Sequence, residues 1–202
     1  MEKKLFTDTK RLTGIAICVA LVVALQVIAT FVKFGPFPIT LTLVPIVIGA
    51  IMFGAAAGAL LGAACGVVVL IMCATGADPG GNVLWAANPL LTAFLCVLKS
   101  SLAGWASGFV YKALETKLKY LNVIVAAAVC PTVNTGIFLA ALIFLYRDVL
   151  VNWAGETDII YFAFVAVAGA NYLIELILNV ALSPGIARVI KISKNIFERR
   201  AG

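Results

Sequence analysis

Residues 55–74 read AAAGALLGAACGVVVLIMCA, twenty consecutive residues without a charged side chain. A helix that crosses the hydrocarbon core of a bilayer needs about 20 mostly apolar residues, so this stretch is long enough for one span. Glycines at positions 54, 58, 62 and 66 recur every four residues and fall along one helix face. Membrane helices associate through close backbone approach at small residues. We therefore expect this face to pack tightly inside the chain.

The rest of the chain has the same apolar character. Of 202 residues, 63% are hydrophobic and only 12% are charged, whereas soluble domains are near half apolar and about a quarter charged. A soluble domain of this size exposes too much surface to hide so many apolar side chains. Disorder is excluded because it requires low hydrophobicity and high charge. The composition predicts an all-α integral membrane protein that forms one domain over residues 1–202.

Six segments are candidate transmembrane helices of a compact bundle. The second is short and contains Pro45, so the main alternative has four full spans, with Thr40–Ala74 forming one re-entrant unit. No cleavable signal peptide is expected, because the first segment is longer than the apolar core of such a peptide. The six segments are Leu12–Val32, Thr40–Phe53, Ala55–Ala74, Leu84–Tyr111, Val123–Tyr146 and Ile159–Ile190.

The distribution of Lys and Arg predicts the orientation of the bundle. Twelve of the 15 basic residues fall in the N-terminal arm, the loop after Tyr111 and the C-terminal tail. An even number of spans places these three regions on one side of the membrane, and basic loops favour the cytoplasm. Both termini are therefore expected in the cytoplasm. This asymmetry explains the net charge of +6 without a nucleic acid partner.

The chain lacks the residues that several catalytic mechanisms require. The chain has no histidine, which removes the Ser-His triad, His-ligated zinc and histidine proton relays. The five cysteines lie inside apolar stretches without a C-x-x-C pair and are interpreted as buried small hydrophobic residues. A membrane hydrolase or transferase would have only Glu175 as an intramembrane acid. No catalytic residue, metal or cofactor is expected.

Two charged side chains lie within predicted spans. A charge at mid-bilayer costs roughly 2.5–3.5 kcal/mol on insertion scales, so it usually has a partner or a function. Helical rise places Lys99 about 22 Å and Glu175 about 24 Å from the outer ends of their segments. Opposite charges at matched depth suggest an ion pair. The pair forms either a structural latch between two helices or the charged floor of a ligand cavity, and spacing leaves both interpretations open.

Amide side chains occur at a second matched depth. Asn134 and Asn171 each lie about 18 Å from the outer ends of their helices. Asn171, Glu175 and Asn179 share one stripe of the last helix. Such amides either grip a polar molecule with donors and acceptors or bond one another across an interface. Their clustering in the last three spans favours a pocket.

The predicted outer mouth of the bundle adds further candidates. The loop from Ala74 to Trp85 is rich in glycine and proline and is expected to be mobile. Trp85 and Asn88 follow it at the start of the fourth segment. A tryptophan at this level is either a ligand contact or an interfacial anchor.

Helix 12–32 carries Ala16, Ala20 and Ala24 at a spacing of four on an otherwise bulky surface. This small-residue groove suits either the docking of a partner's helix or ordinary internal packing. The spacing alone does not separate the two.

Taken together, these motifs resemble the substrate-binding S component of an energy-coupling factor (ECF) vitamin transporter, in the branch that includes pantothenate, folate, hydroxymethylpyrimidine and riboflavin binders. The likeness extends from Leu12 to Lys191. Ala55 and Leu98-Lys99 stand where the family usually has proline and Pro-Arg. The motifs are Ala16-x-x-x-Ala20, Phe53-Gly-Ala-Ala-Ala-Gly58-x-x-x-Gly62, Leu98-Lys99-Ser-Ser-Leu-Ala-Gly104-x-x-x-Gly108-x-x-Tyr111, Pro131-Thr-Val-Asn134-Thr135 and Asn171-x-x-x-Glu175 with Pro184.

The resemblance implies capture of a water-soluble vitamin outside the cell. The chain would dock through Ala16, Ala20 and Ala24 onto a membrane coupling subunit that carries two cytoplasmic ATPases, then topple to release its cargo inside. It has no Gly-x-x-x-x-Gly-Lys-Ser/Thr loop of its own. Lys99 can meet a carboxylate, which favours pantothenate or a folate, whereas Asn134 and Asn171 suit a neutral ring such as riboflavin equally well; pantothenate is slightly preferred as cargo. Riboflavin, folate or a stand-alone ion-coupled secondary transporter are the alternatives. The candidate cargo-binding residues are Trp85, Asn88, Lys99, Asn134, Thr135, Asn171 and Glu175.

Overall fold

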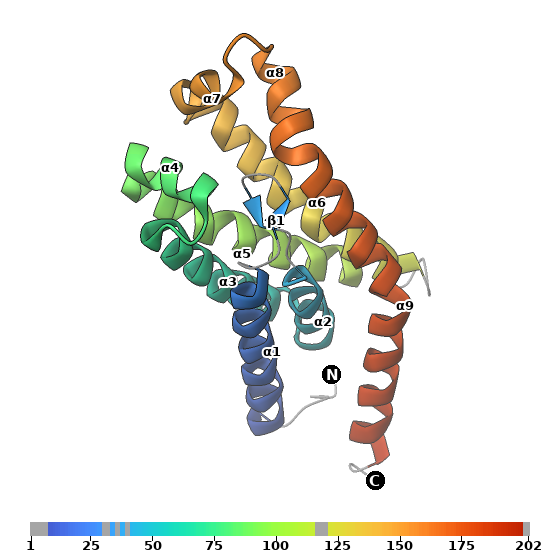
Figure 1. Cartoon of the computed structure of the whole chain (residues 1–202). Helices are drawn as coiled ribbons and strands as arrows, with labels where there is room; N and C mark the ends of the chain where they lie inside the picture. Colours follow the sequence, from blue (N-terminus) through green and yellow to red (C-terminus); the bar gives the residue numbers. More distant parts are fainter. Residues whose placement is uncertain (1–7, 30–32, 35–36, 39–40, 116–120, 200–202) are drawn as a thin grey trace.

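The computed structural model describes residues 8–29, 33–34, 37–38, 41–115 and 121–199, and these are almost entirely helical (Figure 1). A two-residue hairpin pairs Lys33 with Pro38 and Phe34 with Phe37. The elements are α1 (Asp8–Ala29), β1 (Lys33–Phe34), β2 (Phe37–Pro38), α2 (Leu43–Phe53), α3 (Ala55–Thr75), α4 (Pro79–Ala87), α5 (Pro89–Leu114), α6 (Leu121–Phe144), α7 (Arg147–Ala154), α8 (Ile159–Tyr161), the π-helix η1 (Phe162–Gly169) and α9 (Ala170–Arg199).

Five helices in the described part of the chain are long and apolar enough to cross a membrane: α1, α3, α5, α6 and α9. The bent pair Arg147–Ala154 and Ile159–Val167, which meet at 96°, gives a sixth only if it is counted as one span. The predicted segment Thr40–Phe53 yields α2, which has 11 residues. At 1.5 Å per residue it is about 16 Å long, half the thickness of the hydrocarbon core. The prediction that this segment spans the bilayer by itself is therefore not supported.

The prediction of one continuous helix over Leu84–Tyr111 is wrong at its N-terminal end. Helix α4 ends at Ala87, Asn88 has extended backbone angles (φ −156°, ψ 97°), and α5 begins at Pro89. Proline disfavours the helical conformation of the residue before it and is well suited to the first helical turn. The Asn88 side chain accepts a hydrogen bond from the Leu91 amide at 3.1 Å, which caps α5.

Helices α3 and α5 form the closest contact in the bundle. A methyl group built on Gly58, Gly62 or Gly66 would overlap backbone carbonyls of α5, those of Gly104, Ser100 and Cys96 respectively. The two backbones therefore approach as closely as the absence of a β-carbon permits. This contact confirms the predicted internal packing of the glycine face. We call it the α3–α5 seam.

Helix α1 lies on the outside of the bundle, beside α2 and α3 (Figure 1). Its buried stripe consists of Cys18, Val22 and Gln26, while Ala16, Ala20 and Ala24 are exposed. The Arg11 guanidinium donates to the backbone carbonyl of Phe53 at 3.0 Å and fixes the start of α1 against the end of α2. The alanines are thus free of contacts that would cover them within the described chain.

Glycine 54 separates α2 from α3 with φ +95°, a conformation that other residues rarely adopt.

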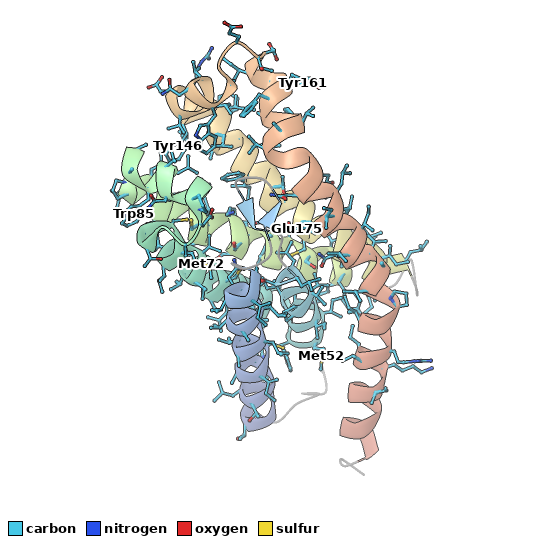
Figure 2. All side chains as sticks on the ribbon, in the orientation of Figure 1. Met52, Met72, Trp85, Tyr146, Tyr161 and Glu175 are labelled. Atoms are coloured by element: carbon cyan, nitrogen blue, oxygen red, sulfur yellow. The ribbon has the colours of Figure 1, made fainter. Side chains whose placement is uncertain are left out.

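The start of α1 and the end of α9 lie at the same end of the bundle, whereas α4, α7 and α8 lie at the other (Figure 1). Large apolar side chains project outward around the bundle, as Figure 2 shows, and Leu90 and Phe144 are 83% and 80% exposed. Such a surface suits a hydrocarbon environment.

Candidate binding site

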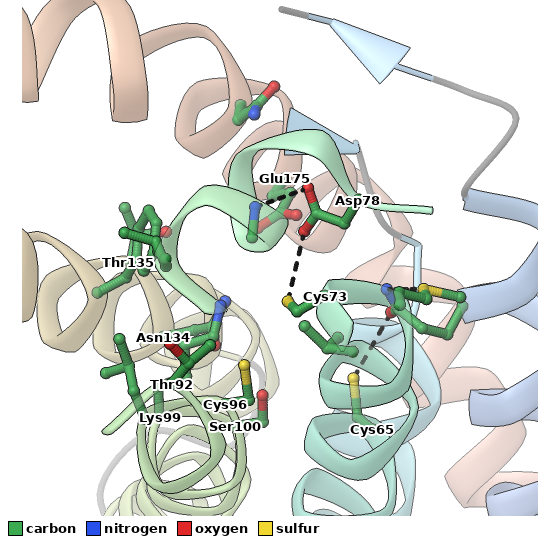
Figure 3. Close-up of a pocket in the computed structure, with 18 of the residues that line it drawn as sticks. Cys65, Cys73, Asp78, Thr92, Cys96, Lys99, Ser100, Asn134, Thr135 and Glu175 are labelled. Carbon is green, nitrogen blue, oxygen red and sulfur yellow. Dashed lines mark hydrogen bonds between the residues drawn. The ribbon is translucent and has the colours of Figure 1, made fainter. Parts of the chain in front are cut away.

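A cavity of about 110 Å³ opens between the helices, with room for several water molecules. Helices α1, α3, α5, α6 and α9 contribute most of its walls, together with the turn before α4 (Figure 3). Its polar and charged lining residues, the thiols aside, are Gln26, Asp78, Thr92, Lys99, Ser100, Asn134, Thr135, Asn171, Tyr172 and Glu175. The other lining residues are apolar or cysteine.

The cavity brings together five of the seven residues proposed from the sequence: Lys99, Asn134, Thr135, Asn171 and Glu175. They come from α5, α6 and α9, the predicted last three spans. The other two residues do not line it. Asn88 is exposed and caps α5, and Trp85 is half-buried on α4. Depth alone placed these two at the mouth of the bundle but did not say which way they face.

Lysine 99 is positioned by α5 and α6. Its Nζ atom lies 4.8 Å from the centre of the Phe138 ring, within cation–π distance. Because α5 begins at Pro89, Lys99 is about 15 Å from the start of its helix, rather than the 22 Å expected from Leu84. Glu175 is buried and lines the same cavity. The direct ion pair between them stays a prediction.

Asparagine 134 has an unsatisfied acceptor at the cavity. Its Oδ1 atom is buried and has no hydrogen-bond partner among the described residues. A buried amide oxygen without a partner costs about 1–3 kcal/mol. A polar ligand in the cavity would remove this cost. Asn179 Oδ1, outside the cavity, also has no partner among the described residues, so the pocket interpretation of Asn134 rests on its place in the cavity wall and stays a prediction.

The predicted stripe on α9 divides at Asn179. Asn171 and Glu175 line the cavity, but Asn179 does not, although it is fully buried. The Asn179 Nδ2 atom donates to the Glu175 backbone carbonyl at 2.8 Å. Asn179 therefore lies below the cavity and contacts the helix turn that carries Glu175.

Sequence reasoning missed Gln26 as a cavity residue. Its Oε1 atom accepts from Thr42 Oγ1 at 2.9 Å and lies 3.6 Å from the Cys65 thiol, and its Nε2 lies 3.9 Å from Met72 Sδ. A long amide side chain within an apolar span was the available signal, because such a group is rarely left without partners in a membrane.

Asp78 was also missed, since the sequence assigned it only to an outer loop. It is 6% exposed and lines the cavity, and its Oδ1 atom accepts from the Gly81 amide at 3.2 Å. It is therefore the N-cap of α4, with Pro79 in the first helical turn. An aspartate followed by proline was the signal for a helix start at this position.

Thr92 connects the cavity wall to the segment after α6. Its hydroxyl lies 2.6 Å from the Tyr146 hydroxyl, and Tyr146 donates to the Asn88 carbonyl at 3.2 Å. Burial raises the pKa of the Tyr146 hydroxyl, so the group stays protonated at neutral pH and remains a donor. These contacts hold the start of α5 against the end of α6.

All five cysteines are buried free thiols, as predicted. Among the described residues, no group of three or more His, Cys, Asp or Glu side chains could hold a metal ion.

The fold and the cavity together define a multi-pass membrane protein with a polar binding chamber inside a helical bundle. A family model described as ECF transporter, substrate-specific component, matches residues 10–187. The chain belongs to this family, and it is a transport protein of the cell membrane. It is similar to the pantothenic acid transporter PanT of Lactococcus lactis subsp. cremoris, with 26% identity over 192 residues that cover 90% of this chain and 93% of the relative. No solved structure matches the chain significantly.

Proposed function

We propose that this chain binds pantothenate on the outer side of the membrane and delivers it inward with an ECF coupling module. The unsatisfied Asn134 oxygen at a cavity that also holds Lys99 carries the proposal. Pantothenate has a carboxylate, an amide and two hydroxyls. A lysine is a charge-assisted donor for the carboxylate. The side chains of Asn134, Thr135 and Asn171 supply donors and acceptors for the remaining groups.

The similarity to a pantothenic acid transporter supports pantothenate over riboflavin and folate as the cargo. Lys99 stands at the family's usual arginine position and retains its positive charge. Lysine binds a carboxylate as a point charge rather than bidentately. Trp85 and Asn88 then support the mouth of the site without touching the cargo.

Calorimetric titration of the purified protein in detergent micelles tests the cargo. Pantothenate is expected to bind below micromolar concentration, whereas riboflavin and folate bind more weakly by at least tenfold. Absence of binding by all three compounds would overturn the proposal. Tighter binding of riboflavin or folate would overturn the choice of pantothenate alone.

Coupling is proposed to occur through α1. Its exposed stripe of Ala16, Ala20 and Ala24 is narrow enough for a partner's helix to approach closely. The partner is a membrane coupling subunit bound to two cytoplasmic ATPases, and both termini of this chain face the cytoplasm. The whole chain acts as one domain and does not hydrolyse ATP.

Leucine at position 20 tests docking. Ala20→Leu is expected to abolish co-purification with the coupling subunit while pantothenate affinity stays within twofold, because α1 contacts the partner with this face. Ala140→Leu makes the same change at an exposed alanine of α6 and should leave assembly intact. Equal assembly of Ala20→Leu and the unmodified protein would refute docking through this stripe.

The buried acid Glu175 favours one alternative, a stand-alone ion-coupled transporter. Uptake into vesicles distinguishes the two. Uptake that needs the ATPases and persists without an ion gradient supports the coupling module. Uptake without ATPases that stops when the gradient collapses supports the alternative.

A further inference from the structure

Gln26 places a further amide group in the cavity wall, on helix α1. Its side chain is 2% exposed and lines the cavity together with Cys65 and Met72 of α3. The proposed function uses side chains of α5, α6 and α9 and assigns no cargo contact to α1. A glutamine amide has four hydrogen-bonding positions, two lone pairs on the oxygen and two N–H groups on the nitrogen. The partners of these positions show what the side chain can still bind.

The oxygen of the Gln26 amide has a donor for each lone pair. Thr42 Oγ1 donates to Oε1 at 2.9 Å, and Cys65 Sγ donates to it at 3.6 Å, the contact marked by the dashed line at Cys65 in Figure 3. In the reversed orientation the oxygen would face Met72 Sδ, an atom that carries no proton to donate. The neighbouring side chains therefore fix the amide with its nitrogen directed to Met72.

The nitrogen of the same amide is less well matched. Nε2 carries two N–H groups and lies 3.9 Å from Met72 Sδ, and a thioether is a weak acceptor. In the part of the chain that the structure describes, Met72 provides the one acceptor for this nitrogen. At least one N–H group therefore remains for another acceptor. A buried donor that makes no hydrogen bond is costly, and an acceptor atom of a molecule in the cavity would remove that cost.

A complementary group lies on another helix of the cavity wall. Asn134 Oδ1 is a buried acceptor with no partner among the described residues. Helix α1 packs against α2 and α3, whereas α6 packs against α5 and α9, so the donor and the acceptor reach the cavity from different walls. A trans amide directs its carbonyl and its N–H in opposite directions. One amide group of a cargo molecule is thus complementary to both side chains.

We propose that Gln26 is a cargo-binding residue, whose Nε2 atom donates a hydrogen bond to the amide carbonyl oxygen of the cargo, while the N–H of the same amide donates to Asn134. This inference rests on the proposed function and identifies the part of the cargo that these two side chains recognise. The amide of pantothenate supplies both groups and leaves the carboxylate for Lys99. In the alternative, Gln26 only joins α1 to α2 and α3.

An analogue of pantothenate tests the contact with the carbonyl oxygen. In the thioamide analogue, sulfur replaces the amide oxygen and is a weaker acceptor. Calorimetric titration of the unmodified protein should show the thioamide binding about fivefold more weakly than pantothenate, because the hydrogen bond from Gln26 is weakened. This measurement needs no variant. Equal affinities for the two compounds would overturn the carbonyl contact.

The variant Gln26→Met removes the N–H groups and keeps a side chain of similar length. Its dissociation constant for pantothenate should be about fivefold to tenfold higher than that of the unmodified protein, through loss of one hydrogen bond. Its dissociation constant for the thioamide should rise less than threefold, because that compound gains little from Gln26 in the unmodified protein. Losses of equal size for the two compounds would overturn the proposal, since a general distortion of the cavity would affect both alike.

The variant Thr42→Val is the matched control for a structural role. Both variants remove the hydrogen bond between Thr42 and Gln26, but Thr42 does not line the cavity. Thr42→Val should therefore keep its pantothenate affinity within threefold. Melting temperatures of the cargo-free variants establish that both are folded and measure the loss of the shared helix contact. A loss of affinity in Thr42→Val as large as that in Gln26→Met would mean that Gln26 acts only through helix packing.

The outcomes separate failure of this inference from failure of the proposed function. If the unmodified protein binds pantothenate and Gln26→Met binds it equally well, the role of Gln26 is overturned while the proposed function stands. If the unmodified protein binds neither compound, the proposed function fails and this inference fails with it.

Discussion

The helices α3 and α5 meet in two different ways along their length. From Gly58 to Gly66 the α3–α5 seam brings backbone against backbone, and no β-carbon fits between them. Beyond Gly66 the helix α3 carries Val69, Met72 and Cys73 instead of glycine, and these side chains line the cavity. Cys65, between Gly62 and Gly66, lines the cavity as well, so the seam and the cavity wall overlap over this part of α3. The difference indicates that one pair of helices supplies both the closest backbone contact of the bundle and a wall of the cavity.

The seam itself is the most sensitive part of this comparison. Gly62→Ala should lower the free energy of unfolding by about 3 kcal/mol, because the added methyl group overlaps the Ser100 carbonyl and backbones must separate. Thermal unfolding in detergent, followed by circular dichroism, measures the change. Gly136→Ala is the control, since a methyl group there meets nothing within 4 Å. Equal melting temperatures for the two variants would contradict the seam.

The positive charge of Lys99 at the cavity is expected to have the next largest effect. Lys99→Met should raise the dissociation constant of pantothenate about 10- to 100-fold, because it removes a charge-assisted hydrogen bond to the carboxylate. Lys112→Met, at an exposed lysine near the end of α5, should bind as the unmodified protein does. Calorimetric titration measures both. If the Lys99 variant keeps its affinity, Lys99 serves as a structural latch and not as a cargo contact.

Replacement of Asn134 sharpens the comparison, because the affinity for pantothenate should fall while the stability of the cargo-free protein should not. Asn134→Leu should weaken pantothenate binding about tenfold, through loss of the amide contacts. The cargo-free protein should be at least as stable as before, because the variant removes a buried oxygen without a partner. Melting curves with and without pantothenate measure both effects. A less stable cargo-free variant would mean that Asn134 holds the helices together, and Asn152→Leu on the exposed face of α7 gives the baseline.

The bilayer explains why the helix packing and most of the cavity residues could be predicted from the sequence. Polar groups inside apolar spans are costly, so Lys99, Asn134 and Glu175 were conspicuous in the sequence and do line the cavity. The glycine repeat likewise predicted a close helix contact. Family membership followed from the order of weak motifs over nearly the whole chain.

Loops were less predictable, because the bilayer places no such constraint on them. Asp78 lies in a turn whose residues are ordinary for an outer loop, and only folding of α4 against α3 turns it into a cavity residue. Trp85 and Asn88 illustrate the reverse case, since they were proposed from the sequence and do not line the cavity. Their depth was plausible, but the break before Pro89 means that they do not continue the helix that carries Lys99. The position of a residue along a helix is easier to predict from the sequence than the side of the helix that its side chain faces.

One further consequence follows from the contacts of Gln26. Its amide touches Thr42, Cys65 and Met72 at once, so a slide of α1 along its own axis by even one residue, about 1.5 Å, would break all three. These contacts therefore fix the position of the exposed alanines on the opposite side of α1 relative to the cavity. A partner helix that packs against these alanines would therefore meet α1 at a position along its axis that is fixed by the buried contacts of Gln26.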